Sequence, residues 1–169
     1  IATEEILGYE PFNSHREKFN FIAIESVSKD SNVSVPQDLE WRDTAVGSNF
    51  MTFYMPRYLT TGEVYAIYDI ATNIPCEHVI ILANTDTYGG GGIYNSYTLT
   101  TAHHPAFKPV VVHEFGHSFG GLGDEYFYEN ADNNDEMHSL ARLVWRIRIV
   151  RTHDAVYCGN PLMDSSSLI

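Results

Sequence analysis

Two histidines and a glutamate are spaced so that they could hold and use a metal ion. His113 and His117 are four residues apart, and Glu114 directly follows the first of them. On an α-helix, residues four apart share one face with their Cβ atoms about 5–6 Å apart, and Zn²⁺ accepts histidine nitrogen as a ligand. In this His-Glu-x-x-His pattern the glutamate serves as general base toward metal-bound water. The pattern therefore predicts a hydrolytic zinc site.

A third protein ligand is expected close behind this pair, because a catalytic zinc ion usually has three and leaves its fourth position to water. Gly120, Gly121 and Gly123 can end a helix and reverse the chain. An acidic residue, Asp124, comes directly after this bend, and Glu125 follows it. We expect Asp124 to be the third metal ligand, with Glu125 as the alternative.

One helix must carry the two histidines, and the flanking residues mark its ends. Pro109 suits a first helical turn, where its missing N–H leaves no hydrogen bond unmade. Residues 110–112 are three valines that can face a buried core. The glycine bend predicts where the helix ends. A surface helix with two solvated histidines is the alternative, and the glycine stop with its following acid disfavours it.

The segments before this helix predict a sheet that covers it. Residues 19–25 are largely apolar and are typical of a central strand, and residues 77–84 contain a continuous apolar run with the same meaning. Residues 49–55 alternate in a way that predicts another strand or an extended segment. Between them, residues 64–71 follow helical spacing, and this helix should stop before Pro75.

A glycine-rich turn and a polar strand come just before the metal-binding helix. Residues 86–92 end in four consecutive glycines, which cannot pack a core and so mark backbone that is exposed or closely approached. Residues 93–101 predict a strand polar enough to lie at the edge of the sheet. An extended peptide could pair with this edge and lay its scissile carbonyl over the metal. The candidate substrate-binding residues are therefore Gly92, Ile93, Tyr94 and Tyr97.

Tyrosine hydroxyls near the ligands could stabilise the oxyanion that forms on a scissile carbonyl. Tyr126 lies two residues after Asp124 and is a candidate catalytic residue, and Tyr94 or Tyr97 could take the same role. The competing interpretation for each is an ordinary buried or half-buried tyrosine that only packs.

In chain order, these elements predict an α/β (α+β) fold with a twisted, mostly parallel sheet above an active-site helix. At 169 residues the chain is expected to form one domain. Its upper lobe would cover residues 1–121, and a smaller lower lobe would cover residues 122–169.

The charge and cysteine content limit the classes of partner and compartment. The net charge is −12, and the 10 basic residues are scattered through most of the chain, which argues against binding nucleic acid or an anionic membrane surface. No apolar run reaches the roughly 18–20 residues of a membrane span. The chain starts at Ile1 without a signal peptide, so we expect a mature form or a trimmed domain. Cys76 and Cys158 could form one bridge, although two free thiols are the simpler expectation.

Two stretches of the chain are distinctive as continuous motifs. They are Gly-Gly-Gly-Gly-Ile-Tyr-Asn-Ser-Tyr at residues 89–97 and Val-His-Glu-Phe-Gly-His-Ser-Phe-Gly-Gly-Leu-Gly-Asp-Glu-Tyr at residues 112–126. Both resemble the IgA-peptidase family of bacterial zinc metalloendopeptidases. Shorter similarities lie at residues 11–15, 57–61 and 84–86, so the resemblance covers about residues 9–128. After about Glu136 the sequence departs from the usual continuation of that family.

This resemblance implies a zincin fold, cleavage of peptide bonds in proteins, and a secreted, cell-surface or periplasmic bacterial protein. His113 and His117 carry over as zinc ligands, Glu114 as the general base and Asp124 as the third ligand. The leading hypothesis is a zinc-dependent endopeptidase that acts on extracellular proteins or peptides. The alternative is a catalytically weak or inactive protease-fold module that binds host protein or glycan. The unfamiliar tail supports that alternative, and the intact Glu114 opposes it.

The C-terminal third carries two weaker expectations. Residues 130–136 are acidic and could hold Ca²⁺, but they lack the spaced ligands and the glycine of a dedicated calcium loop, which favours a solvated loop. Apolar residues between 140 and 150 follow helical spacing and predict an amphipathic helix that closes the domain. The natural substrate, the cleavage site and the oligomeric state do not follow from the sequence.

Overall fold

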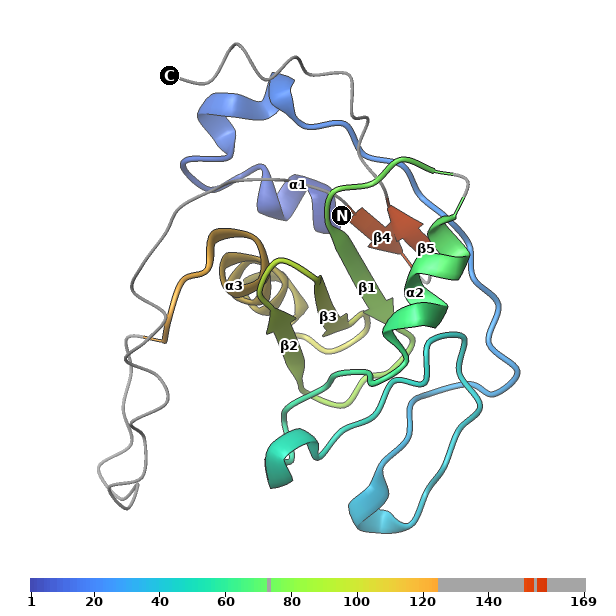
Figure 1. Cartoon of the computed structure of the whole chain (residues 1–169). Helices are drawn as coiled ribbons and strands as arrows, with labels where there is room; N and C mark the ends of the chain where they lie inside the picture. Colours follow the sequence, from blue (N-terminus) through green and yellow to red (C-terminus); the bar gives the residue numbers. More distant parts are fainter. Residues whose placement is uncertain (73, 125–150, 154, 158–169) are drawn as a thin grey trace.

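A three-stranded sheet forms the platform for the active-site helix (Figure 1). The computed structural model describes the whole chain except Asn73, residues 125–150, Asp154 and residues 158–169. Within the described residues the fold is a mixed α+β arrangement, with helices against both faces of the sheet.

The strands lie in the order β1–β3–β2, where β1 is Val79–Ala83, β3 is Tyr97–Thr101 and β2 is Gly90–Ile93. β1 and β3 run parallel, whereas β2 and β3 run antiparallel. The expectation of a mostly parallel sheet is therefore wrong, because one of the two strand pairings is antiparallel.

The predicted edge strand is the central one. β3 pairs with β1 on one side and with β2 on the other, so residues 93–101 offer no free edge at β3. Polarity was misleading here because the threonines of β3 are buried, and Thr98 satisfies its hydroxyl inside the protein. The edge position belongs instead to β2, and three of the glycines expected to form a turn are its first residues.

Alternation along the strands divides the core into two clusters, one on each face of the sheet. On one face, Ile80 and Leu82 of β1 pack under α3 (Phe107–Gly120) with Val111, Phe115 and Phe119. The helix α1 (Ala2–Ile6) adds Ala2 and Ile6 to this cluster. On the opposite face, α2 (Val64–Ala71) buries Ile67 and Ala71 in a second cluster. The members that β1 and β3 contribute to this second cluster are Val79, Ile81, Ala83, Tyr97 and Leu99.

The remaining elements are short. Three 3₁₀ helices, η1 (Asn13–Lys18), η2 (Pro36–Asp38) and η3 (Thr52–Tyr54), lie in the connections before α2. β4 (Arg151–His153) and β5 (Ala155–Tyr157) form an antiparallel pair beside β1. Among the described residues, no helix combines the length and apolar character needed to cross a bilayer.

The helix predicted over residues 64–71 and the strand predicted over residues 77–84 are both present, as α2 and β1. β1 does not lie in the middle of the three-stranded sheet, as its apolar run had suggested. It ends the order β1–β3–β2, and its five residues are nonetheless all buried. An apolar run indicates only that both faces of a strand are buried, and a strand at the end of the strand order can also be buried on both faces.

Two predicted strands are absent from the sheet. Residues 19–25 form no strand, and Phe19 packs instead among aromatic rings, at 5.9 Å from Phe12 and 6.4 Å from Phe119. Residues 49–55 are interrupted by η3, where Phe53 and Tyr54 have positive φ values of 54° and 62°. Left-handed residues cannot continue a pleated strand, so the alternating pattern is not used.

Several expectations fall on the C-terminal part of the chain. The lower lobe, the acidic loop over residues 130–136 and the helix near residues 140–150 lie largely or wholly outside the described residues. Cys76 is disulfide-bonded, so it is not the free thiol favoured as the simpler expectation. Cys158 lies outside the described residues.

Candidate metal centre

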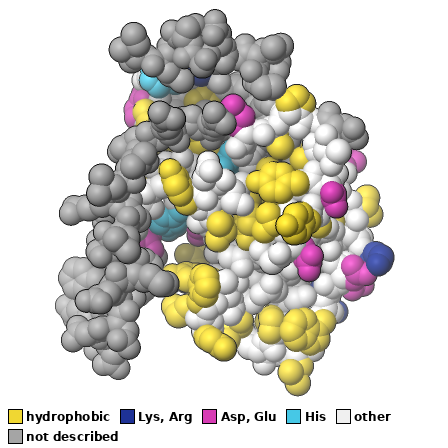
Figure 2. All heavy atoms as spheres, viewed as in Figure 1, with side chains coloured by type: hydrophobic (Ala, Val, Ile, Leu, Met, Phe, Trp, Pro, Cys, Tyr) yellow, Lys and Arg dark blue, Asp and Glu magenta, His cyan; other side chains and the backbone are white. Residues whose placement is uncertain are grey.

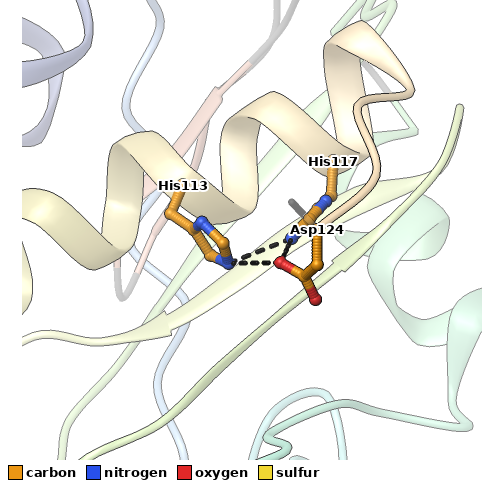
Figure 3. A group of neighbouring side chains, drawn as sticks. All are labelled: His113, His117 and Asp124. Carbon is orange, nitrogen blue, oxygen red and sulfur yellow. Dashed lines mark hydrogen bonds and ion pairs between the residues drawn. The ribbon is translucent and has the colours of Figure 1, made fainter. Parts of the chain in front are cut away.

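The helix α3 ends where the glycine bend predicts. Gly121 has a left-handed φ of 61°, and its N–H bonds the His117 carbonyl at 3.1 Å. A side chain is disfavoured at this φ, and a Cβ would also lie 2.8 Å from the Tyr94 ring. The bend turns the chain back along the helix, which brings Asp124 beside the two histidines (Figure 3).

The three predicted metal ligands converge on one point. The Nε2 atoms of His113 and His117 are 3.0 Å apart, and the Oδ1 atom of Asp124 lies 3.4 Å from the first and 3.3 Å from the second. Tetrahedral ligands at about 2.0–2.1 Å from a zinc ion are separated from each other by about 3.3–3.4 Å. The donor set and its spacing therefore fit one tetrahedral Zn²⁺, with a fourth position left over.

The helix bend also sets the tautomer of His117. Its Nδ1–H donates to the Leu122 carbonyl at 2.6 Å, which leaves the Nε2 lone pair for a metal. Zinc-bound histidines commonly donate their second ring N–H in this way. The three ligands line an open depression of about 570 Å³, and Figure 2 shows histidine and acidic atoms side by side at the surface.

Glu114 lies between the metal ligands and the sheet, and the glycines of β2 make room for it. A Cβ built on Gly90 would be 2.7 Å from the Oε1 atom of Glu114. A Cβ built on Gly92 would be 2.3 Å from the Glu114 carbonyl oxygen and 2.8 Å from the Cβ of His117. The glycine run therefore marks a close approach of strand and helix, as one of its two interpretations predicted.

Burial and neighbouring charges set the proton affinity of Glu114. Burial raises the pKa of its carboxyl to about 7, and Asp124 adds to the rise, while His117, a hydrogen bond from the Gly92 N–H and Arg57 oppose it. Burial also lowers the pKa of His113, which favours the neutral imidazole that a metal needs. A dication at this point would favour the charged carboxylate of Glu114.

Arg57 is a site neighbour that was not singled out from the sequence. The Gly90 N–H donates to the Arg57 carbonyl at 3.2 Å, and the Leu59 N–H donates to the Gly90 carbonyl at 3.0 Å, so this segment runs beside β2. The Arg57 guanidinium lies 5.6 Å from the centre of the Tyr58 ring, and its charge acts on both Glu114 and His113. The sequence did contain a hint of its importance, because residues 57–61 belong to the stretches that carry the family resemblance.

The candidate substrate-binding residues separate into exposed and buried ones. Ile93 and Tyr94 are 38% and 53% exposed at the end of β2. Gly92 instead contacts the helix and bonds Glu114. Tyr97 is 2% exposed in the core cluster on the far face, and its hydroxyl donates to the Thr61 carbonyl at 2.9 Å. The expectation for Tyr97 is therefore wrong, because strand alternation turns its side chain away from α3.

The outer edge of β2 is also less open than a peptide-pairing strand would be. Both backbone groups of Gly90 are already bonded to residues 57–59, so pairing with a substrate there would require their release. Glu125 and Tyr126, the alternative ligand and the candidate catalytic tyrosine, lie outside the described residues.

A helix that carries His-Glu-x-x-His, packed against a sheet and followed by an acidic third ligand, is the arrangement of a metallopeptidase site. The comparison with family models agrees, since residues 2–140 match the model of IgA Peptidase M64. The chain therefore belongs to this peptidase family, and the resemblance inferred from its motifs is confirmed. A search of the curated proteins finds no match.

Proposed function

We propose that this protein is a zinc-dependent endopeptidase that hydrolyses peptide bonds in extracellular proteins. The observation that carries the proposal is the convergence of three ligand atoms, 3.0–3.4 Å apart, directly beside Glu114. Family membership supports the class of reaction, and the geometry of the ligands supports the choice of metal.

Each side chain of the site has a separate task in this proposal. The Nε2 atoms of His113 and His117 and a carboxylate oxygen of Asp124 would hold the ion. When bound, zinc supplies Lewis-acid polarisation of a carbonyl group and lowers the pKa of a coordinated water. Glu114 accepts the proton of the attacking water and later passes it to the leaving nitrogen of the peptide.

The surroundings of Glu114 orient it for this proton transfer. The Gly92 N–H holds the carboxylate from the sheet side. The positive charge of Arg57 acts on Glu114 and His113, and it would help to stabilise the negative charge that develops on a scissile carbonyl. The exposed Ile93 and Tyr94 lie at the open end of β2, where a peptide could contact them.

We also propose that the protein works outside the cytosol, on protein or peptide substrates. The disulfide at Cys76 supports an oxidising compartment. The net charge of −12 supports a partner other than nucleic acid.

Metal analysis and a mixed peptide library test this function together. Protein purified without chelator should carry one zinc per chain and cleave internal peptide bonds, and chelation should stop cleavage until zinc is restored. Glu114→Gln should keep the zinc but lose about 10²–10⁴-fold in turnover. Fully loaded wild-type protein that cleaves nothing, or an active Gln variant, would exclude the proposal. The first of those results would favour a binding module.

A further inference from the structure

Thr100 occupies the middle of the sheet, on the face covered by α3. In the strand registers it lies between Leu82 of β1 and Gly90 of β2. Paired residues of neighbouring strands point to the same face, and Leu82 packs in the cluster under α3. The Thr100 side chain therefore points to the sheet face that α3 covers, and α3 carries the proposed metal ligands.

The hydroxyl of Thr100 lacks a hydrogen-bond partner within the described part of the chain. The residue is 0% exposed, so bulk water does not reach the hydroxyl. An unpaired buried hydroxyl costs free energy, and native proteins hold few of them. Valine has nearly the same shape and would avoid this cost, so the hydroxyl needs an explanation.

The Glu114 carboxylate packs against Gly90, the residue of β2 that pairs with Thr100. The N–H and carbonyl of Gly90 bond Arg57 and Leu59 on the outer side, so Gly90 and Thr100 form the closer, non-hydrogen-bonded kind of antiparallel pair. Gly90 has no side chain, and the space where its Cβ would lie is within 2.7 Å of the Oε1 atom of Glu114. Thr100 therefore borders the space that the carboxylate occupies.

We propose that Thr100 is a positioning residue for the general base. In the zinc-loaded enzyme its hydroxyl donates to the Glu114 carboxylate, directly or through one buried water. The Gly92 N–H and the Thr100 hydroxyl then hold the carboxylate from the sheet side, and its remaining lone pairs face the substrate. The assignment rests on the proposed function for its effect on turnover.

Removing only the hydroxyl tests the kinetic effect. Thr100→Val should lower kcat about 10- to 100-fold, the range of one hydrogen bond to a charged group, while KM and zinc affinity stay unchanged. Thr100→Ser should recover most of the rate. An unchanged kcat in Thr100→Val would overturn the proposal and identify the hydroxyl as a tolerated packing defect.

Thr98→Val is a matched control on the same strand and the same face. The Thr98 hydroxyl bonds Ser118 rather than Glu114, so this variant should lose thermal stability while keeping kcat well below its Tm. Equal losses of kcat in the two valine variants would mean that any polar change under α3 slows the enzyme, and that Thr100 has no special role.

A stability cycle tests the contact independently of turnover. Thr100→Val, Glu114→Ala and the double variant are compared by thermal unfolding with saturating zinc. If the hydroxyl bonds Glu114, Thr100→Val should raise the Tm only when Glu114 is absent, because only then is the hydroxyl unpaired. The same shift in both backgrounds would overturn the proposal, even if the wild-type protein proved inactive and the proposed function had failed.

Discussion

Thr98 and Thr100 lie two residues apart on the same face of β3, yet their surroundings differ. The Thr98 hydroxyl is 2.5 Å from the Ser118 hydroxyl and 3.3 Å from the Nε2 atom of His78, and these last two groups are 2.8 Å apart. The Thr100 hydroxyl has no such partner among the described residues. Thr98 belongs to a closed polar network, whereas Thr100 pairs across the sheet with Gly90, the glycine that packs against Glu114.

The two threonines therefore mark two parts of the contact between the sheet and α3. Around Thr98 the contact anchors the helix, and around Thr100 it faces Glu114, the proposed general base. Ser118 follows His117, a proposed ligand, in the chain, so the network of His78, Thr98 and Ser118 holds the helix against the sheet next to the candidate metal site. A fully bonded buried network stabilises one arrangement. At Thr100 a buried hydroxyl is left unpaired among the described residues, and at Gly90 the missing side chain leaves room for Glu114, the proposed general base. Sites of function often carry such unfavourable features.

Phe115→Ala should have the largest effect, because it weakens the packing that anchors α3 on the sheet. Phe115 is 0% exposed, stacks on Phe119 at 4.7 Å and meets His78 edge-on at 5.6 Å. Truncation should lower the free energy of unfolding by about 3–5 kcal/mol, because a large cavity would open between sheet and helix. Urea unfolding measures the loss, and a loss below about 1 kcal/mol would mean that the helix repacks.

Gly90→Ala should instead disturb the position of the Glu114 carboxylate. The new Cβ would meet the Cγ and Oε1 atoms of Glu114 at 2.7 Å, and the flexible side chain would have to move aside. We expect a cost of about 1–3 kcal/mol in stability, with a larger proportional loss in kcat than in zinc affinity. Steady-state kinetics beside a zinc titration checks this, and unchanged kcat would show that Glu114 does not need that position.

Acidification should lower the stability of the folded protein through His78, which belongs to the network that anchors α3. Burial lowers the pKa of His78 to about 3, whereas an unfolded histidine titrates near 6.5. Below pH 6.5 the unfolded chain therefore binds a proton that the native chain refuses, and native stability falls until about pH 3. At pH 5 the loss from this residue should be about 2 kcal/mol.

His78→Gln is the control for that pH dependence. Glutamine keeps a polar group of similar reach without a titration in this range, so the variant should be less stable at neutral pH but less sensitive to acid. Unfolding curves between pH 7 and pH 4.5 compare the two proteins. Parallel pH profiles would contradict the assignment of acid sensitivity to His78.

Ser118→Ala should have the smallest effect. It removes one member of the network but leaves Thr98 and His78 in contact at 3.3 Å, so we expect a loss of about 1 kcal/mol and an unchanged kcat. Thermal unfolding and kinetics measure both. A large drop in zinc affinity would show that the network acts on the metal site directly, and would weaken the contrast between the two threonines.

The sequence alone determined the helix of the site, its glycine stop and the choice of His113, His117 and Asp124 as the group that converges. These features are local, since a four-residue spacing, a left-handed glycine and a short bend each depend on neighbours along the chain. The same holds for α2 and β1, whose apolar patterns report their own burial.

Only the tertiary structure decided that β3 is central and that the glycine run is an edge strand. It also decided that the charge of Arg57 acts on Glu114, and that Thr100 pairs with the glycine against which Glu114 packs. Strand order depends on contacts between distant segments, and a polar strand such as β3 looks exposed until its partners are known. The packing of the sheet against α3 also leaves the Thr98 hydroxyl bonded and the Thr100 hydroxyl unpaired among the described residues, because the partners of each hydroxyl come from distant segments of the chain.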